Sequence, residues 1–240
     1  MYNFAWPACD EFGPVQGTPP RWLLVSNIVC SEVGEVPPDI FAPKDDEQVL
    51  RLVLEHPLAW VVSLDAGGFR ATPLPLRPRV GSEGRIEALE GHMARSNPLC
   101  AALQRDARAL ILFSGPQGYI SPSWMTNRTW APTWNYAVVQ FLATITFDEM
   151  PARLDAHLHD LANAMERGRP GAWHPSEMGA RYATLTRMIV PFEAKVVEQR
   201  AKFKLGQDER DTVFAEMTEA LGRTGADELL AWMREANPGR

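Results

Sequence analysis

One short motif places groups that could bind a phosphate where a strand is expected to turn into a helix. The stretch GHMARSNP, residues 91–98, brings His92 and Arg95 to this turn. Charged side chains such as the guanidinium of Arg95, placed beside a helix N-terminus, are suited to binding a dianion. A structural alternative stays open, in which Ser96 or Asn97 caps the helix and Arg95 is solvated.

A second motif could add positive charge to the same site. In KFKLGQD, residues 202–208, Lys202 and Lys204 fall on one face of an extended segment. The alternative is that both lysines lie at a solvated strand end. The two motifs together favour an anion site but do not demand one.

Three tryptophans lie close together in SPSWMTNRTWAPTWNY, residues 121–136. They are Trp124, Trp130 and Trp134, and the two prolines among them argue against a helix. A tryptophan buries a large apolar ring but needs a partner for its N–H group. The segment is therefore typical of a binding site as much as of a core.

Other catalytic signatures are absent from the sequence. No glycine-rich nucleotide loop follows a predicted strand, and no nucleophile elbow or catalytic triad is visible. His157 and His159 are two apart on a predicted helix, so we expect them on different faces and on a solvated surface rather than at a metal. No catalytic residue and no metal ligand is assigned.

The helices and strands that must position these residues are predicted from the spacing of apolar residues, which differs between a helix and a strand. Short apolar or β-branched runs predict strands at 58–64, 69–76, 85–89, 109–113, 134–147 and about 192–203. Helices are predicted at about 45–56, 97–105, 151–168, 176–189, 209–221 and 226–236. In the longest strand, the face carrying Asn135, Val139 and Phe141 is predicted to be core, and the opposite face is mixed enough to border a partner or ligand. This order predicts an α+β, barrel-like domain.

Composition narrows the class of protein. The 240 residues are 45% hydrophobic and carry a formal net charge of -6, which argues mildly against a dedicated nucleic-acid surface. Cys9, Cys30 and Cys100 are widely spaced, so neither a disulfide framework nor a zinc site is indicated. No apolar run near the start is long enough to cross a bilayer. We expect a soluble, unprocessed cytoplasmic protein.

In this order, the motifs resemble the PaiB-like family of FMN-binding proteins. The residues that carry the resemblance are PPDIFAPKD at 37–45, GHMARSNP, FSGPQGYISPSW at 113–124, PTWNYAVV at 132–139 and KFKLGQD. The resemblance implies a split β-barrel, related to pyridoxamine phosphate oxidase and flavin reductases, with peripheral and C-terminal helices. It divides the chain into an N-terminal extension, 1–36, holding one short predicted strand near 22–30, and an FMN-binding domain, 37–240.

The resemblance also implies a homodimer with FMN in a groove between the subunits. Carried over by position, the predicted cofactor-binding residues are Thr72, His92, Arg95, Asn97, Ser121, Ser123, Trp124, Trp134, Asn135, Lys204 and Gln207. The residues at 92–97 would lie near the phosphate or ribityl end, those at 121–124 would line the cleft, and Trp134 and Asn135 would approach the ring. Lys204 and Gln207 would close the site. Trp130 is assigned to loop packing.

Several positions depart from the family pattern. The loop Met125 to Ala131 is shorter than in the family pattern, and Pro73 and Gln140 stand where the family commonly has histidine. The last motif ends in Gly206-Gln207-Asp208, which also differs from the family pattern. These differences lie around the presumed cleft. They predict a changed ligand or substrate pocket, and they leave open the alternative that FMN binding has weakened or been lost.

The favoured function is an FMN-dependent oxidoreductase acting on a small organic molecule. The alternative is an FMN-binding negative transcriptional regulator or flavin sensor, with a local basic surface from Arg77, Arg79 and Arg85. Haem binding is a weaker third possibility, because no histidine stands out as an axial ligand. Tyr119 and Tyr136 could donate protons, but structural roles are expected for both.

Overall fold

The computed structural model describes residues 39–65 and 67–240. Residues 39–240 form one compact unit, and the preceding residues belong to a second unit. The strand predicted near 22–30 and the predicted N-terminal extension lie outside the described residues. The boundary predicted at residue 37 stays a prediction.

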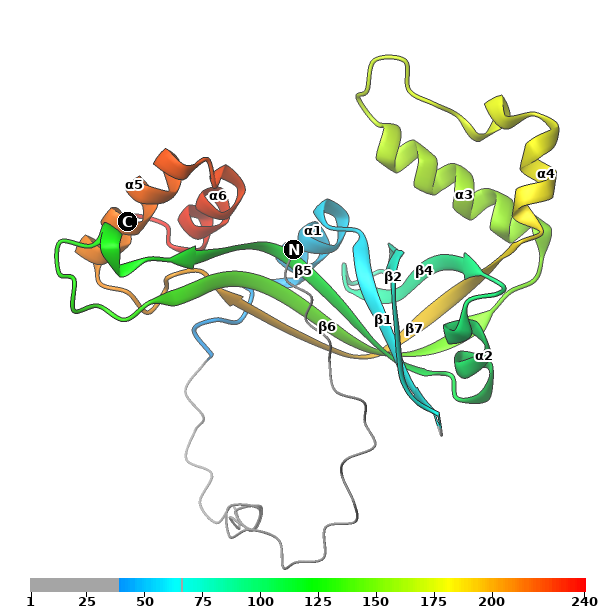
Figure 1. Ribbon diagram of the computed structural model, residues 1–240, viewed down its shortest axis with the longest axis horizontal. Coiled ribbons are helices and arrows are strands. Elements are labelled where there is room, and N and C mark those ends of the chain that lie inside the picture. The colour runs from blue at the N-terminus through cyan, green and yellow to red at the C-terminus, as the bar shows by residue number, and fades with distance from the viewer. Residues whose placement is uncertain (1–38, 66) are drawn as a thin grey trace, which may run out of the picture. The chain divides into compact units, whose positions relative to one another are not determined.

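The domain is built on one antiparallel sheet of seven strands (Figure 1). The strands are β1 (Leu58–Asp65), β2 (Gly68–Pro75), β3 (Arg77–Val80), β4 (Ile86–Ala94), β5 (Arg108–Ile120), β6 (Thr133–Phe147) and β7 (Ile189–Lys204). Their order across the sheet is β2-β1-β5-β6-β7-β4-β3. The long β5–β6 hairpin and β7 form its centre.

Six α-helices surround the sheet in the described part of the chain. They are α1 (Asp46–Glu55), α2 (Pro98–Arg105), α3 (Pro151–Glu166), α4 (Ala180–Thr186), α5 (Asp211–Thr224) and α6 (Asp227–Ala236), with 3-10 turns η3 (Pro122–Trp124) and η4 (Pro175–Met178). Figure 1 shows α5 and α6 over the far end of the β5–β6 hairpin, with α3 and α4 beside the start of β7. The sequence therefore predicted the α+β class correctly.

The structure corrects the sequence prediction at two elements. β3 was missed because Arg77–Val80 is only four residues long and contains Pro78, which a short edge strand tolerates. The helix predicted at 176–189 is two pieces, η4 and α4. They are separated by Gly179, whose φ of 54° lies in the left-handed region that ends a helix.

The hydrophobic core lies between one face of the sheet, called here the inner face, and helices α1, α2, α5 and α6. In β6, Ala137, Val139 and Phe141 are fully buried, which confirms the predicted core face of this strand. Alternate residues of β6 point to the opposite, outer face, where exposure is higher. The inner face therefore packs into the core, and the outer face is more exposed.

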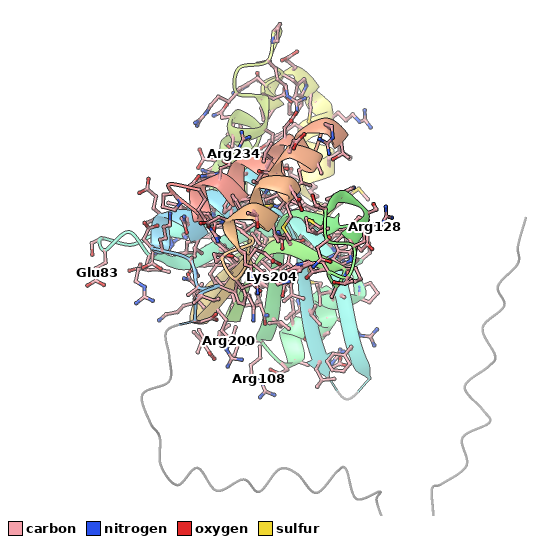
Figure 2. All side chains as sticks on the ribbon, turned by 90° about the vertical axis from the view of Figure 1, so that its left-hand side faces the viewer. Glu83, Arg108, Arg128, Arg200, Lys204 and Arg234 are labelled. Carbon is pink, nitrogen blue, oxygen red and sulfur yellow. The ribbon has the colours of Figure 1, made fainter. Side chains whose placement is uncertain are left out.

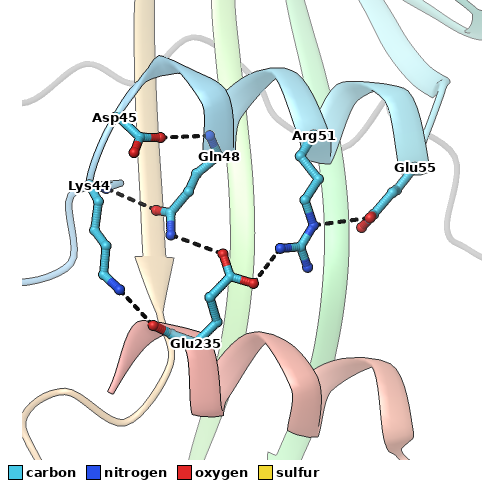
Figure 3. Close-up of polar contacts among 6 residues, drawn as sticks. All are labelled: Lys44, Asp45, Gln48, Arg51, Glu55 and Glu235. Carbon is cyan, nitrogen blue, oxygen red and sulfur yellow. Dashed lines mark hydrogen bonds and ion pairs between the residues drawn. The ribbon is translucent and has the colours of Figure 1, made fainter. Parts of the chain in front are cut away.

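A polar clamp joins α1 to α6 (Figure 3). Arg51 bonds both Glu55 of its own helix and Glu235 of α6, and its guanidinium lies 4.1 Å from the ring centroid of Trp232. Lys44 Nζ donates to the Glu235 carbonyl at 2.6 Å. The clamp holds α6 against α1 and the residues just before α1. Helix α6 in turn covers the inner face of β5.

Candidate functional site

The outer face of β2, β1, β5 and β6 carries large apolar side chains. Leu58, Trp60, Leu64, Phe69 and Leu142 are each between 42% and 78% exposed. The register places them side by side, because Leu64 pairs with Phe69 and Val62 pairs with both Ala71 and Leu110. A contiguous exposed apolar patch of this kind marks an interaction surface.

Basic side chains of β7 border this patch. Arg200, Lys202 and Lys204 pair with Gln140, Val138 and Tyr136 of β6 and share its outer face. Lys204 Nζ donates to Thr133 Oγ1 and lies 3.4 Å from the carbonyl of Trp134 (Figure 2 labels Lys204 and Arg200). The prediction that the two lysines share one face is confirmed. The outer face thus combines apolar surface with positive charge.

Thr72 and Asn97 form a structural link between β2 and α2. The Asn97 amide donates to Thr72 Oγ1 at 3.2 Å, and its Oδ1 accepts from the Leu99 amide at 2.9 Å. Asn97 is therefore the N-cap of α2, the structural alternative considered above for this motif. The bond to Thr72 fixes where the helix begins.

His92 lies at the outer face of β4 under α3. Its Nδ1 is 3.1 Å from Nε2 of His157, and the two rings pack edge to face. His157 is only 7% exposed, so the prediction of a solvated His157 was wrong. Helical spacing alone could not show that α3 would turn this position toward the sheet.

Burial lowers the pKa of both histidines. The pKa of His157 falls to about 4, because of desolvation first and then the nearby His92 and Arg77. Desolvation also lowers the pKa of His92. Both rings are therefore neutral at pH 7, which leaves Arg95 as the permanent charge of this motif.

Arg95 opens onto a cavity of about 490 Å³ between α3 and α4. Its guanidinium lies 3.3 Å from Glu149, and both side chains are well exposed. Tyr182 also lines the cavity and donates to Asp155 at 2.7 Å; burial, together with this bond, raises the pKa of Tyr182 to about 12. The exposed Arg95–Glu149 pair is weak, so Arg95 is available to an anion.

The hydroxyl and tryptophan residues of the segment 121–136 lie at the other end of the β5–β6 hairpin. Ser121 and Ser123 hydrogen bond to each other at 2.8 Å at the turn η3. Trp124 packs against the core, whereas Trp134 is 52% exposed, with its ring 6.1 Å from that of Tyr119. Trp134 is therefore the tryptophan available to a ligand.

Three further residues have structural partners. Trp130 packs against the core, as expected for loop packing, and its ring lies 5.9 Å from the Arg210 guanidinium. Asn135 is buried, with its amide 3.4 Å from Met233 Sδ. Gln207 bonds the backbone of Phe203 and Leu205. These three side chains therefore make their contacts on the inner face or in the turn after β7, and not on the outer face.

One subunit does not bring all the predicted residues together. Val61 pairs with Thr72 and with Ile111, whereas Tyr119 pairs with Trp134. The stretch of β5 from Ile111 to Tyr119 spans roughly 25 Å. The predicted residues therefore form two groups, one near Arg95 and one near Trp134.

Sequence reasoning missed the apolar outer face of β1 and β2. The signal was present in LAWVVSL, where Leu58, Trp60, Val62 and Leu64 alternate with residues that are also small or apolar. A strand that is apolar on both faces is expected to be covered on both faces. At β1 and β2, the helices of the described residues cover only the inner one.

No helix in residues 39–65 and 67–240 has both the length and the apolar character needed to cross a membrane.

Comparison with known proteins places these observations in a family. The family described as "Putative FMN-binding domain" matches residues 36–198. A relative from Bacillus subtilis, named protease synthase and sporulation protein PAI 2, is 28% identical over 187 residues, covering 77% of this chain and 87% of the relative. An uncharacterized protein of Emericella nidulans is 27% identical over 56% of this chain and 68% of its own.

Solved structures share the fold at low sequence identity. The flavocytochrome Anf3 of Azotobacter vinelandii superposes with a TM-score of 0.53 at 18% identity, covering 69% of this chain and 70% of the other. An FAD and haem binding protein of Mycobacterium smegmatis gives 0.53 at 19% identity, covering 72% and 78%. The split-barrel prediction is confirmed. Because the family match spans well over half of its length, the chain belongs to this FMN-binding domain family, whose cofactor is FMN.

Proposed function

We propose that this protein is a homodimer that holds FMN between the outer faces of its subunits and acts as a flavin-dependent oxidoreductase on a small organic molecule. The observation that carries the proposal is the exposed apolar face of β1, β2, β5 and β6 beside the basic side chains of β7. In the described part of one subunit this face is exposed. A second copy would cover it.

The separation of the two residue groups supports a shared site. In a two-fold dimer each subunit presents the same face, so the Arg95 group of one subunit can meet the Trp134 group of its partner. A site made this way uses both motifs although they lie far apart in one chain.

The residues present fit the chemistry of FMN. A phosphate needs cationic donors, for which Arg95 and Lys204 are exposed or partly exposed. An isoalloxazine ring needs aromatic or apolar surface, which Trp134 and Tyr119 provide on the outer face. When bound, FMN would supply the capacity to accept a hydride. The chain's own residues would bind and orient the cofactor and exclude water around it.

The phosphate assignment is tested by replacing one arginine. Arg95→Ala should weaken FMN binding by roughly 10- to 100-fold, as expected for loss of a charge-assisted bond. Arg234→Ala is the matched control, because Arg234 is exposed on α6, which packs on the inner face (Figure 2). Flavin absorbance and mass analysis of the compound released by heat give the readout. Equal flavin content in the two variants would remove Arg95 from the site.

The dimer is tested on the apolar patch. Trp60→Glu places a charge in the middle of the outer face and should give a monomer by light scattering, with loss of FMN in parallel. Glu83→Gln is a control, because Glu83 lies on an exposed turn. A Trp60→Glu protein that stays dimeric and yellow would show that another surface joins the subunits.

The reaction class needs its own assay. Under anaerobic conditions, an oxidoreductase substrate should bleach the flavin absorbance of wild-type protein. If small organic donors, including reduced nicotinamides, leave the flavin oxidised while FMN remains bound, the redox part of the proposal fails and the binding part stands.

The second candidate is an FMN-binding regulator. It is favoured by the Bacillus subtilis relative, whose name links that protein to protease synthesis and sporulation. The basic surface considered for this role is weakened, since Arg77, Arg79 and Arg85 pair with Asp160, Glu193 and Asp46. A salt-dependent shift of DNA mobility would support the regulator.

A further inference from the structure

The end of helix α1 and the start of helix α6 bring three metal-ligating side chains together. Helix α1 ends at Glu55 and has His56 as its C-cap, whereas Glu228 lies in the first turn of α6. One nitrogen or oxygen atom from each of these residues lies within 4.8 Å of the other two. Within residues 39–65 and 67–240, this is the one group of three such side chains whose ligand atoms converge.

The directions of the two helices explain why these residues meet. Lys44, just before α1, bonds the carbonyl of Glu235 at the end of α6, and His56 contacts Glu228 at the start of α6. The helices therefore run in opposite directions. Figure 3 shows the contacts of Glu235, with Glu55 further along α1. The packing that forms the polar clamp thus also holds the three ligating residues together.

The position of His56 Nε2 suits a metal ligand better than a hydrogen-bond donor. The atom lies 2.9 Å from Oε1 of Glu228, yet it is buried and has no hydrogen-bond partner among the described residues. Both observations hold if the oxygen lies off the axis along which the ring nitrogen donates or accepts. Two ligands of one ion are arranged in this way, because each directs its lone pair at the ion. The alternative is an ion pair, which needs a protonated ring.

The two carboxylates can adjust to an ion. Ligand atoms about 2.1 Å from a tetrahedral ion lie about 3.4 Å apart, so the group must contract by up to about 1 Å. The side chains of Glu55 and Glu228 are 43% and 57% exposed, which leaves them room to move. Glu55 accepts from Arg51 Nε at 3.0 Å through one oxygen and has a second oxygen for an ion. Ligating carboxylates are commonly oriented by such an outer hydrogen bond.

The charge and the donor types decide which ion fits. Two carboxylates favour a cation, and the positive charge of Arg51 is shared with Glu235 of the clamp. One imidazole nitrogen with carboxylate oxygens suits first-row divalent ions, and Zn²⁺ accepts both types of ligand. Mg²⁺ demands near-ideal octahedral geometry with oxygen ligands, so it fits this group less well.

We propose that Glu55, His56 and Glu228 bind a divalent transition-metal ion such as Zn²⁺, which joins the end of α1 to the start of α6. Three protein ligands leave one position of a tetrahedral ion for water. The ligands are far apart in the sequence, so only the folded chain brings them together. The bound ion would therefore stabilise the packing of α6 on the inner face, on the other side of the sheet from the surface proposed for FMN.

The test titrates untagged, full-length protein with Zn²⁺ at pH 7.5, with Mg²⁺ as the matched ion. We expect saturable binding of one Zn²⁺ per chain, a higher melting temperature and a shift of the ¹⁵N resonance of His56 Nε2. Mg²⁺ at the same concentration should have none of these effects. The proposal is overturned if Zn²⁺ does not bind, if Mg²⁺ acts equally, or if Zn²⁺ binds without moving the His56 resonance.

Variants of the full chain locate the site. Glu228→Gln changes an exposed side chain and keeps its size, so it is the decisive variant. It should weaken Zn²⁺ binding roughly 100-fold or more, because loss of an outer-shell partner alone costs about 10- to 100-fold. His56→Gln should have the same effect. Unchanged Zn²⁺ affinity in Glu228→Gln would refute the site.

Two control variants make the same changes elsewhere. Glu83→Gln lies on an exposed turn (Figure 2), and His174→Gln changes a histidine whose ring lies 5.1 Å from that of His159. Both should bind Zn²⁺ as the wild type does. Weakened binding in His174→Gln alone would place the ion at those histidines and contradict the proposal. FMN content should be the same in all four variants, which separates this result from the proposed function.

Discussion

Acid should destabilise this protein through His157 more than through any exposed histidine. The folded pKa of His157 is about 4, against an ordinary value of 6.5. As pH falls below 6.5 the unfolded chain takes up this proton first, so the stabilising contribution is complete above that pH. It is lost between pH 6.5 and 4, and nothing further is lost below 4.

The size of this effect follows from the same values. One pKa unit corresponds to about 1.4 kcal/mol, so the interval from 6.5 to about 4 amounts to about 3 kcal/mol. The groups that face the ring are His92 on β4, Arg77 on β3 and Asp160 on α3. Asp160 opposes the lowering, and the other two add to it. The pKa of about 4 reflects all of these contributions together, so about 3 kcal/mol is their net effect.

Urea denaturation at several pH values between 7.5 and 4 measures this contribution. The free energy of unfolding of wild-type protein should fall by up to about 3 kcal/mol more than that of His157→Gln over this range. Arg234→Gln, at an exposed position on α6, should follow the wild type. Parallel pH profiles for wild type and His157→Gln would show that α3 opens without protonation of a buried ring, and the argument would fail.

The remaining predictions concern stability and are measured by urea or thermal unfolding. Gly206→Ala should cost about 1 to 2 kcal/mol, because Gly206 has a φ of 87° and its added Cβ would lie 3.2 Å from Phe214. Trp232→Ala should cost about 3 to 5 kcal/mol, since Trp232 is buried and packs against Phe203. Glu235→Gln removes a partly exposed partner of Arg51 and should cost at most about 1 kcal/mol. Asn97→Ala removes the cap of α2 and should cost about 1 kcal/mol.

The sequence predicted the fold well where periodicity is long. β6 alternates over fifteen residues, and its core face agrees with the structure at every residue from Asn135 to Ile145. The helix expected near 209–221 is α5, Asp211–Thr224, and buries Val213, Phe214 and Met217 as an amphipathic stripe. Four-residue β3 has too few positions to show a period, so it could not be found in this way.

The candidate site was less accessible to sequence reasoning. The motif around Arg95 correctly located a strand-to-helix turn, but it could not show that Asn97 would use its side chain on α2 and Thr72. His157 shows the same limit. Its surroundings depend on how α3 lies over β4, and no local pattern in α3 reports that.

The strand register shows where two of the departures from the family pattern lie in the fold. Pro73 pairs with Trp60, Trp60 with Leu112, and Leu112 with Gln140, so the two positions where histidine is common lie on one row across the outer face. Apolar side chains of two strands separate them. These two of the sequence differences therefore lie on the surface that we propose as the FMN and dimer interface. Two neighbouring changes on one row are what we expect of a changed pocket in a retained fold.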